Sequence, residues 1–400
     1  MVDPTLLKSL TGQHKDRVTK AIFSPSLKQV ISSSNDGLIL AWGLRPNARP
    51  NKFQGHQGAV TDVAINDRGT LIASCSRDHT VRIWENNAQA KDLTQNSKLK
   101  HSGPVKSVAF NSDGSLLVSA GDDKLVKIWD VEKRKFVQSF RDHQNWVRSA
   151  QFSLDSRMVA SGSDDRSIIL WDVVHGGQIH KFNDHAGMVT GVRYHPDGSC
   201  LASCSTDKKI KIFDCRSQRL LQHYDAHNDA VNSVAFHSNG QFLVSSSNDS
   251  TVKIWDLRMG QIMYTLFGHE GPSTTAEWSP LGDFLISGGQ DQNIVIWNSN
   301  LNEQVTEELV GMKGARVDTD IYITDKADIK RLPEDKPKPS KKEQKELDKK
   351  TAQSKPSATP KVAAKKEEEE RNVIGNREHK GPCYRQLKPE VKQTLDKLVY

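Results

Sequence analysis

The sequence predicts an all-β fold, a seven-bladed propeller, and three observations lead to that prediction. First, four residue types recur at fixed spacing: a His, a Ser 18 residues later, an Asp 22 later and an aromatic residue 28 later. Second, this quartet occurs seven times within the first 300 residues, with successive histidines 42, 45, 42, 42, 42 and 42 residues apart. Third, the segments between these markers alternate as short β-branched and aromatic runs separated by Asp-Gly or Asp-Asp turns. A repeat of about 40–45 residues has the length of one four-stranded blade, so seven repeats predict seven blades.

Each of the seven units resembles a WD40 repeat. Six of the eight tryptophans lie in register, and the Trp-Asp pair itself is present at 129–130, 171–172 and 255–256. The quartets are His14, Ser32, Asp36 and Trp42; His56, Ser74, Asp78 and Trp84; His101, Ser119, Asp123 and Trp129; His143, Ser161, Asp165 and Trp171; His185, Ser203, Asp207 and Phe213; His227, Ser245, Asp249 and Trp255; His269, Ser287, Asp291 and Trp297.

The chemistry of the four types explains why they occur together. The Asp closes a tight turn and accepts a hydrogen bond from the His, the His bonds the Ser hydroxyl, and the Ser accepts the indole N–H. Each buried polar group thereby gains a partner, where an unpaired one costs about 1–3 kcal/mol. Ser, His and Asp in contact also suggest an acyl-transfer triad. Seven equivalent copies without a nucleophile-elbow glycine pattern favour a structural role, and we assign no catalytic residue.

The two ends of the repeat region are predicted to pair. Residues 6–10 precede His14 as residues 135–140 precede His143, so they read as the outermost strand of the blade whose other strands lie near 272–298. Pairing the first strand with the last blade removes a sheet edge and closes the ring.

Composition excludes several other classes of protein. The chain is 36% hydrophobic and has no apolar run near the ~20 residues that a membrane helix needs, and its first ten residues lack a signal-peptide pattern. The five cysteines are an odd number, with Cys75 and Cys204 inside predicted strands, which suits buried thiols in a reducing compartment. Cys200, Cys204 and Cys215 lack the spacing of a zinc site, so no metal and no cofactor are expected.

The sequence changes character after the last repeat. Residues 301–380 are rich in Lys, Glu, Pro and Ser and are predicted to be a disordered, charged linker. Within it, residues 336–366 hold eleven Lys and three acidic residues, a pattern that fits either a solvated spacer or an acidic partner. Residues 381–400 are predicted to begin an amphipathic, coiled-coil-like helix, with Pro389 at its start.

Three phrases of the repeat region, at residues 143–148, 219–224 and 264–275, resemble the proteome-of-centriole family of WD40-repeat proteins. The plan of seven blades, a variable linker and a C-terminal helix-forming segment is also similar to that family. The resemblance implies residence in the cytoplasm and cytoskeleton, at centrioles and basal bodies. It further implies contact with tubulin of the triplet microtubules and with other centriolar proteins. The implied role is that of a scaffold that stabilises the microtubule wall and supports cilium assembly.

The blade register also predicts where a partner binds. Positions three and five after each His, and the position before each Asp, should line one rim of the ring, because the His loop and the Asp turn bond each other. Charged residues, Asp122 and Asp164 among them, and one Trp gather there on the first four blades, and Arg and Trp are favoured at interface hot spots. The predicted partner-binding residues are Arg17, Arg77, Lys106, Trp146 and Arg148. The alternative is that Trp146 packs against the next blade and the charges are solvated.

Two function classes follow from these observations. The leading one is a non-catalytic centriolar scaffold that binds tubulin, without a small-molecule substrate, nucleic acid or membrane, and with self-association through the C-terminal helix left open. The alternative is a generic WD40 adaptor, such as a ligase substrate receptor or an RNA-processing complex subunit, because propellers host many tasks.

Overall fold

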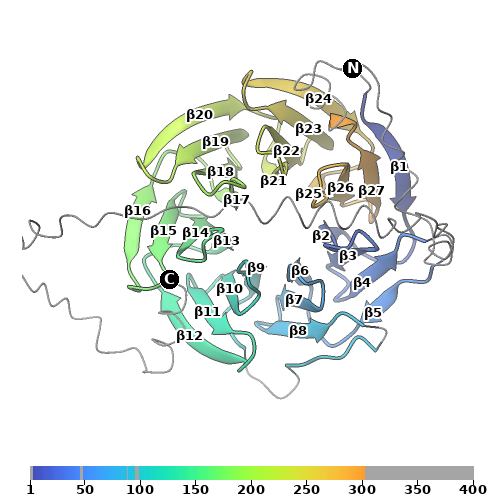
Figure 1. Ribbon diagram of the computed structural model, residues 1–400, viewed down its shortest axis with the longest axis horizontal. Helices are drawn as coiled ribbons and strands as arrows, with labels where there is room; N and C mark the ends of the chain where they lie inside the picture. The colour runs from blue at the N-terminus through green and yellow to red at the C-terminus, as the bar shows by residue number, and fades with distance from the viewer. Residues whose placement is uncertain (1–2, 46–47, 88, 95–98, 302–400) are drawn as a thin grey trace, which may run out of the picture. The chain divides into compact units, whose positions relative to one another are not determined.

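The computed structural model describes residues 3–45, 48–87, 89–94 and 99–301. These residues form 27 strands in seven antiparallel sheets, which follow one another around a ring as the blades of a propeller (Figure 1). This confirms the predicted all-β, seven-bladed fold. The predicted C-terminal helix 381–400 and all of the predicted linker 301–380 except Leu301 lie outside the described residues.

The blades follow the chain in order, and the strands of each follow one another from the innermost to the outermost; the outermost strand of the seventh blade, β1, comes from the start of the chain. Blades one to four are β2 (Val18–Phe23), β3 (Gln29–Ser34), β4 (Ile39–Gly43) and β5 (Asn51–Phe53); β6 (Val60–Ile65), β7 (Leu71–Ser76) and β8 (Val81–Glu85); β9 (Val105–Phe110), β10 (Leu116–Gly121), β11 (Val126–Asp130) and β12 (Lys135–Phe140); β13 (Val147–Phe152), β14 (Met158–Ser163), β15 (Ile168–Asp172) and β16 (Gln178–Phe182). Blades five to seven are β17 (Val189–Tyr194), β18 (Cys200–Ser205), β19 (Lys209–Asp214) and β20 (Arg219–Asp225); β21 (Val231–Phe236), β22 (Phe242–Ser247), β23 (Thr251–Asp256) and β24 (Gln261–Phe267); β25 (Ser273–Trp278), β26 (Phe284–Gly289), β27 (Ile294–Asn298) and β1 (Thr5–Leu10).

The ring closes through the first strand of the chain, as predicted. Strand β1 pairs antiparallel with β27, from Thr5 opposite Asn298 to Leu10 opposite Ile294. The side-chain amide of Asn300 also donates a hydrogen bond to the carbonyl of Asp3 at 2.9 Å. Figure 1 shows β1 as the outermost strand of the blade that holds β25, β26 and β27. The last blade therefore contains both ends of the repeat region and has no unpaired edge on β27.

The second blade is irregular on its outer side, where the spacing between histidines is three residues longer. Among the described residues of this blade there are three regular strands, and two isolated bridges, Thr80 to Lys100 and Trp84 to Asp92, occupy the outer position. Arg82 forms an ion pair with Asp92 at 2.6 Å across this outer position.

The apolar core lies between blades. One cluster combines Leu116 and Val118 of blade three with Val147 and Phe152 of blade four, and six further clusters have the same kind of composition. Since a blade alone leaves one face of its sheet uncovered, its neighbours are needed to complete its core. Cys75 and Cys204 are both buried, as predicted.

Candidate protein-binding surface

The His–Ser–Asp quartets form one hydrogen-bonded network per blade. In all seven, His Nδ1 donates to the Asp carboxylate at 2.8–3.0 Å. With its proton on Nδ1, the His accepts the Ser hydroxyl on Nε2 at 2.7–2.8 Å. In six blades the Ser Oγ also accepts the Trp indole N–H at 2.7–3.0 Å. In blade five Phe213 stands at this position and supplies no donor.

These networks hold the folded state together, and their serines are out of reach of a substrate. All seven Ser side chains have no exposed surface. Burial acts to raise the pKa of Asp123, but the hydrogen bond and charge of His101, the backbone N–H of Ser102 and the charge of Lys127 together outweigh burial and lower this pKa to about 2. Burial lowers the pKa of His101, which opposes its protonation. A buried Ser that is already hydrogen-bonded to His and Trp links the strands of the blade to the loop that carries the His.

A backbone hydrogen bond places the predicted rim positions on one face of the ring. In every blade the N–H of the residue before the quartet Asp donates to the carbonyl of the residue three after the His. The bond from Asp164 to Trp146 is 2.9 Å, and that from Arg77 to Ala59 is also 2.9 Å. We refer to this side of the ring, where the His loops and the Asp turns meet, as the His–Asp face.

The side chain of the fifth residue after the His forms a hydrogen bond to the next blade in most of the blades. Thr19, Thr61, Thr190 and Thr274 each donate their hydroxyl to a carbonyl at the start of the next inner strand, at 2.5–2.8 Å. Asn232 does the same with its side-chain amide at 2.7 Å. Blades three and four carry Lys106 and Arg148 there, so two adjacent blades place charged groups where the other five place inter-blade bonds.

Lys106 and Arg148 both contact the one exposed Trp of this face. The Lys106 ammonium and the Arg148 guanidinium each lie 5.9 Å from the centre of the Trp146 ring, within the range of cation–π attraction. Trp146 is 44% exposed, and Met188, at the equivalent position of blade five, is 44% exposed as well. The predicted alternative, in which Trp146 is packed away against its neighbour, does not fit this exposure.

Each of the two cations also has a carboxylate partner. Arg148 bonds Asp164 through two nitrogens, at 2.7 and 2.8 Å, and Lys106 lies 3.4 Å from Asp122. We call the group Lys106, Asp122, Trp146, Arg148 and Asp164 the Trp146 cluster. Two of its charges are positive and two are negative, so its net charge is zero. Both acids were predicted to lie on this rim, since each stands directly before a quartet Asp, but only the basic residues and Trp146 were predicted to bind a partner.

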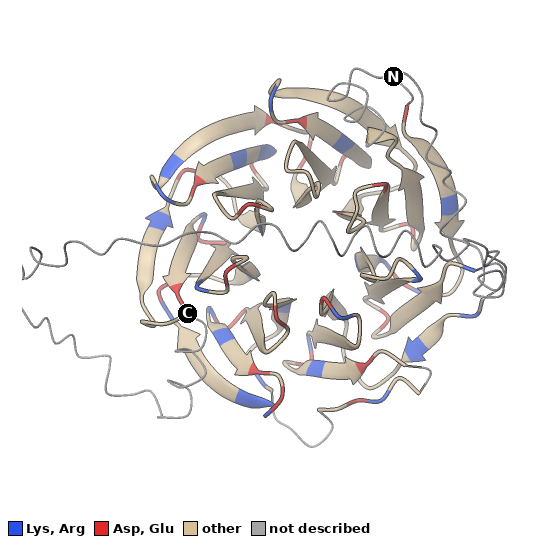
Figure 2. Ribbon diagram, in the orientation of Figure 1, with Lys and Arg blue, Asp and Glu red and all other residues tan. Residues whose placement is uncertain are grey.

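The remaining predicted residues relate to the Trp146 cluster in different ways. Burial lowers the pKa of the Lys106 ammonium, and the positive charges of Arg148 and of the exposed Arg77 lower it further. Arg17 lies in blade one with its Nε buried and without a hydrogen-bond partner, and no contact joins it to the Trp146 cluster. Blue and red positions are interspersed around the whole ring in Figure 2. The structure therefore brings together Lys106, Trp146 and Arg148, with Arg77 beside them.

Sequence reasoning missed a second charged group, which lies inside the central channel. Lys20 and Arg193 both bind the carboxylate of Glu277, Arg193 at 2.8 Å, and the carboxylate of Asp62 lies nearby. Burial acts to raise the pKa of Glu277, but the attraction of its two cations lowers this pKa to about 2. These channel charges come from β2, β6, β17 and β25. The sequence feature that could have indicated this group is a charged residue near the middle of each of these predicted inner strands.

Two observations bear on other classes of site. Within the described ranges, no group of three or more His, Cys, Asp and Glu side chains is arranged to hold a metal ion. In the same part of the chain, no helix has the length and apolar character needed to cross a membrane.

Comparisons with known proteins agree with the seven-blade architecture. The family model described as "WD domain, G-beta repeat" matches residues 4–43, 48–85, 94–130, 134–172, 176–214, 218–256 and 260–298. Eukaryotic translation initiation factor 3 subunit I of Pyricularia oryzae is 32% identical over 76 residues, 19% of this chain and 22% of that protein. The 26S proteasome regulatory subunit RPN14 of Saccharomyces cerevisiae is 38% identical over 64 residues, 16% of this chain and 15% of that protein. Nuclear distribution protein PAC1 of Arthroderma benhamiae is 31% identical over 82 residues, 20% of this chain and 18% of that protein. Each of these similarities spans less than a quarter of the relative's length.

Proposed function

The chain belongs to the WD40 family, and from that premise we propose that it is a non-catalytic scaffold whose His–Asp face docks a protein partner on the Trp146 cluster. The observation that carries this proposal is the setting of Trp146. Its ring is exposed, yet it is held between two cations, one of which is fixed by a two-nitrogen ion pair. A fixed aromatic ring loses little entropy when a partner covers it, and Trp and Arg are the residues that most often dominate interface energies.

The pairing of charges decides what kind of recognition this surface provides. Because Lys106 and Arg148 already have carboxylate partners, an incoming acidic group must share them with Asp122 and Asp164. The ion pairs therefore contribute orientation and specificity more than net attraction. Arg77, which has exposed surface and lies near Lys106, is the cation best placed to attract an acidic partner from solution.

The partner we propose is tubulin of the triplet microtubules in centrioles and basal bodies, where the chain would stabilise the microtubule wall and support cilium assembly. The support for this partner is the resemblance of residues 143–148, 219–224 and 264–275 to the proteome-of-centriole family. One of these phrases contains both Trp146 and Arg148. The proposed location is accordingly the cytoplasmic cytoskeleton.

A second candidate function is a subunit of a different assembly. Two of the relatives are named as subunits, one of a translation initiation factor and one that regulates the proteasome. The same docking surface would serve either role, since only the partner differs.

Replacing Trp146 by Ala tests the docking surface. The full-length chain with Trp146→Ala, expressed with a fluorescent tag, should lose most of its centriolar signal while its thermal unfolding stays close to wild type. Phe267→Ala is the matched control, because Phe267 is also an exposed aromatic, at 76%, but belongs to blade six. Normal localisation of the Trp146 variant would contradict the proposed surface. A wild-type chain that never gathers at centrioles, but enters another complex in a Trp146-dependent way, would favour the second candidate.

A further inference from the structure

The central channel opens into a cavity of about 420 Å³ at the end opposite the His–Asp face. The inner strands begin at the His–Asp face and end at the turns that lead into the second strands. Residues of those turns, among them Asp67, Ser112 and Leu154, line this cavity. The channel charges form its inner end, and a smaller cavity of about 120 Å³ lies on their other side. The larger cavity is therefore separate from the Trp146 cluster.

The charges that line this cavity do not balance. Two cations, Lys20 and Arg193, face three carboxylates, those of Asp62, Asp67 and Glu277. Both cations bind Glu277 directly. The residual charge of the lining is thus one negative unit, and it is carried on the side of blade two.

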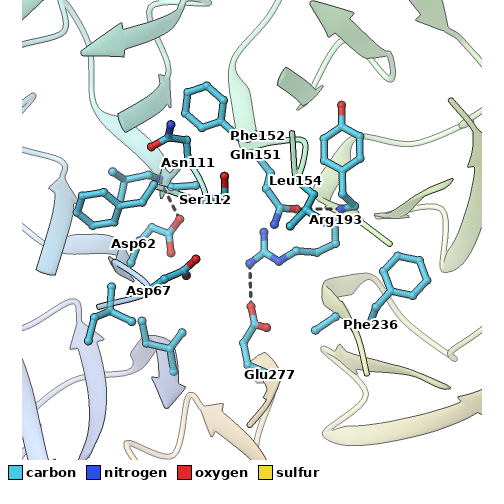
Figure 3. Close-up of a pocket in the computed structure, with 18 of the residues that line it drawn as sticks. Asp62, Asp67, Asn111, Ser112, Gln151, Phe152, Leu154, Arg193, Phe236 and Glu277 are labelled. Carbon is cyan, nitrogen blue, oxygen red and sulfur yellow. Dashed lines mark hydrogen bonds and ion pairs between the residues drawn. The ribbon is translucent and has the colours of Figure 1, made fainter. Parts of the chain in front are cut away.

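Asp62 and Asp67 carry this excess negative charge. The Asp62 carboxylate accepts the backbone N–H of Val63 at 2.9 Å and of Val108 at 3.0 Å, and no Lys or Arg of the described chain lies within ion-pair distance of it. Asp67 makes no hydrogen bond or ion pair with any described residue. Burial raises the pKa of both carboxyls, which is the behaviour of acids that lack a sufficient counter-charge. Figure 3 draws both carboxylates on one side of the cavity and Arg193 on the other.

The remaining walls supply flat apolar surface. Phe152 and Phe236 line the cavity with Leu154, which is 62% exposed (Figure 3). Phe152 itself is only 4% exposed and packs in the core, so Leu154 and the half-buried Phe236 are the apolar side chains that offer area to a partner entering from this face. The volume suits one long side chain together with the backbone that carries it.

From this combination we infer that the cavity is a second binding site, which takes an arginine side chain of a protein partner. The guanidinium would lie between the carboxylates of Asp62 and Asp67, and the apolar stem of the side chain would contact the exposed Leu154. A guanidinium fits better than an ammonium because it is planar and bonds two acceptors at once. The scaffold would then hold two partners at once, one on each face of the ring.

Ligand-observed saturation-transfer NMR on the full-length chain tests this inference. The probe is a capped pentapeptide with one central Arg between alanines, and the reference is the same peptide with citrulline, which has the shape of Arg without its charge. Saturation should reach the Arg side-chain protons, and the citrulline peptide should bind about tenfold more weakly, because charge-assisted hydrogen bonds to carboxylates are lost.

Two variants locate the binding site. Asp67→Asn should weaken the Arg peptide roughly fivefold, the scale of one partly exposed charge pair. Asp113→Asn is the matched control, since it removes one negative charge from the corresponding turn of blade three, outside the cavity lining, and it should leave binding unchanged. Trp146→Ala should also leave binding of the Arg peptide unchanged. A failure of the cavity inference can therefore be told apart from a failure of the proposed function. An absence of binding by wild type, equal binding of the citrulline peptide, or equal effects of the two Asp variants would each overturn the inference.

Discussion

Arg148 holds Asp164 through a two-nitrogen ion pair, with Nε at 2.7 Å from one carboxylate oxygen and Nη2 at 2.8 Å from the other. Asp164 is only 9% exposed, whereas Arg148 keeps part of its surface in water. The hydrogen bonds that Arg148 donates to Asp164 raise the pKa of its guanidinium. Arg148 is thus both a candidate contact for a partner and a counter-charge that the folded ring requires.

Removing Arg148 should therefore lower stability as well as binding. We expect Arg148→Ala to cost roughly 1–3 kcal/mol in the free energy of unfolding, because it leaves the Asp164 carboxylate buried without its cation. The variant Arg148→Ala with Asp164→Asn should recover part of that loss. Urea unfolding of both variants and of Asp164→Asn alone measures the coupling. Additive effects would show that the two side chains do not stabilise each other.

Blade five should open more readily than its neighbours. Phe213 packs against Phe182, with ring centres 4.5 Å apart, but Ser203 lacks the indole donor found in the other six blades. The expected difference in opening free energy is about 1 kcal/mol or less, the net value of one hydrogen bond. Hydrogen exchange of the amides of the second strand of each blade, read out by mass spectrometry, measures it. Equal protection of β18 and β22 would contradict the expectation.

The folded ring should extend one residue beyond the predicted boundary at 300. Leu301 has no exposed surface and packs in the core cluster that contains Trp278, Leu285 and Trp297. We expect Leu301→Ala to destabilise the full-length chain by roughly 2–4 kcal/mol, as buried Leu truncations do. Leu221→Ala, at a position that is 51% exposed, serves as the control and should have little effect. A thermal midpoint of Leu301→Ala equal to that of the control would place the boundary at 300 after all.

Truncation after residue 303 should, in contrast, leave a monomeric ring that unfolds cooperatively. All seven quartets, strand β1 and Leu301 precede that point. Sedimentation and calorimetry of the truncated chain check this prediction. Loss of the cooperative transition would mean that later residues are needed for folding.

Stability should fall in two stages as the pH is lowered. Burial lowers the pKa of His101 and of His227, so below about 6.5 the unfolded chain takes up protons that the folded chain refuses. The pKa of Asp249, like that of Asp123, is about 2 in the ring, because hydrogen bonds to the carboxylate outweigh the effect of burial. The stability that these carboxylates contribute is complete above about pH 4 and is lost as the pH falls toward 2.

Urea unfolding at pH 7.5, about 5.5 and about 3.5 tests this order. We expect a modest loss of stability between the first two values and a larger loss at the third. A free energy of unfolding that stays constant, or rises, between pH 7.5 and 5.5 would contradict the assignment of neutral, buried His101 and His227.

The arrangement of the blades was predictable because its signal is local and repeated. The His at 14 and the Asp at 36 are separated by 22 residues, a spacing that holds in all seven units, and the bond between them closes a loop within one blade. The strand at residues 6–10 was predictable for the same reason, since it precedes His14 as residues 135–140 precede His143. In the sequence, blade two differs from the others only by three extra residues between His56 and His101. This extra length does not indicate which conformation the chain adopts there, so the irregular outer side could not be predicted.

The charge pattern of the rim was only half predictable. Register placed Trp146, Arg148 and Asp164 on one face, yet it could not tell whether Arg148 turns toward a partner or toward Asp164. Side-chain direction depends on what lies within a few ångströms, and here a buried carboxylate outcompetes water for the guanidinium.

By itself, the sequence determined the seven blades, the networks that fasten them and the strand that closes the ring, because these features depend on residues a fixed distance apart in the chain. Only the tertiary structure decided what meets across the ring axis. Lys20 and Glu277 are 257 residues apart, and Arg193 and Glu277 are 84 apart, yet all three join in the channel. No spacing rule connects them, because their contact is fixed by the curvature of the closed ring, which brings the inner strands of three blades within reach of one axis.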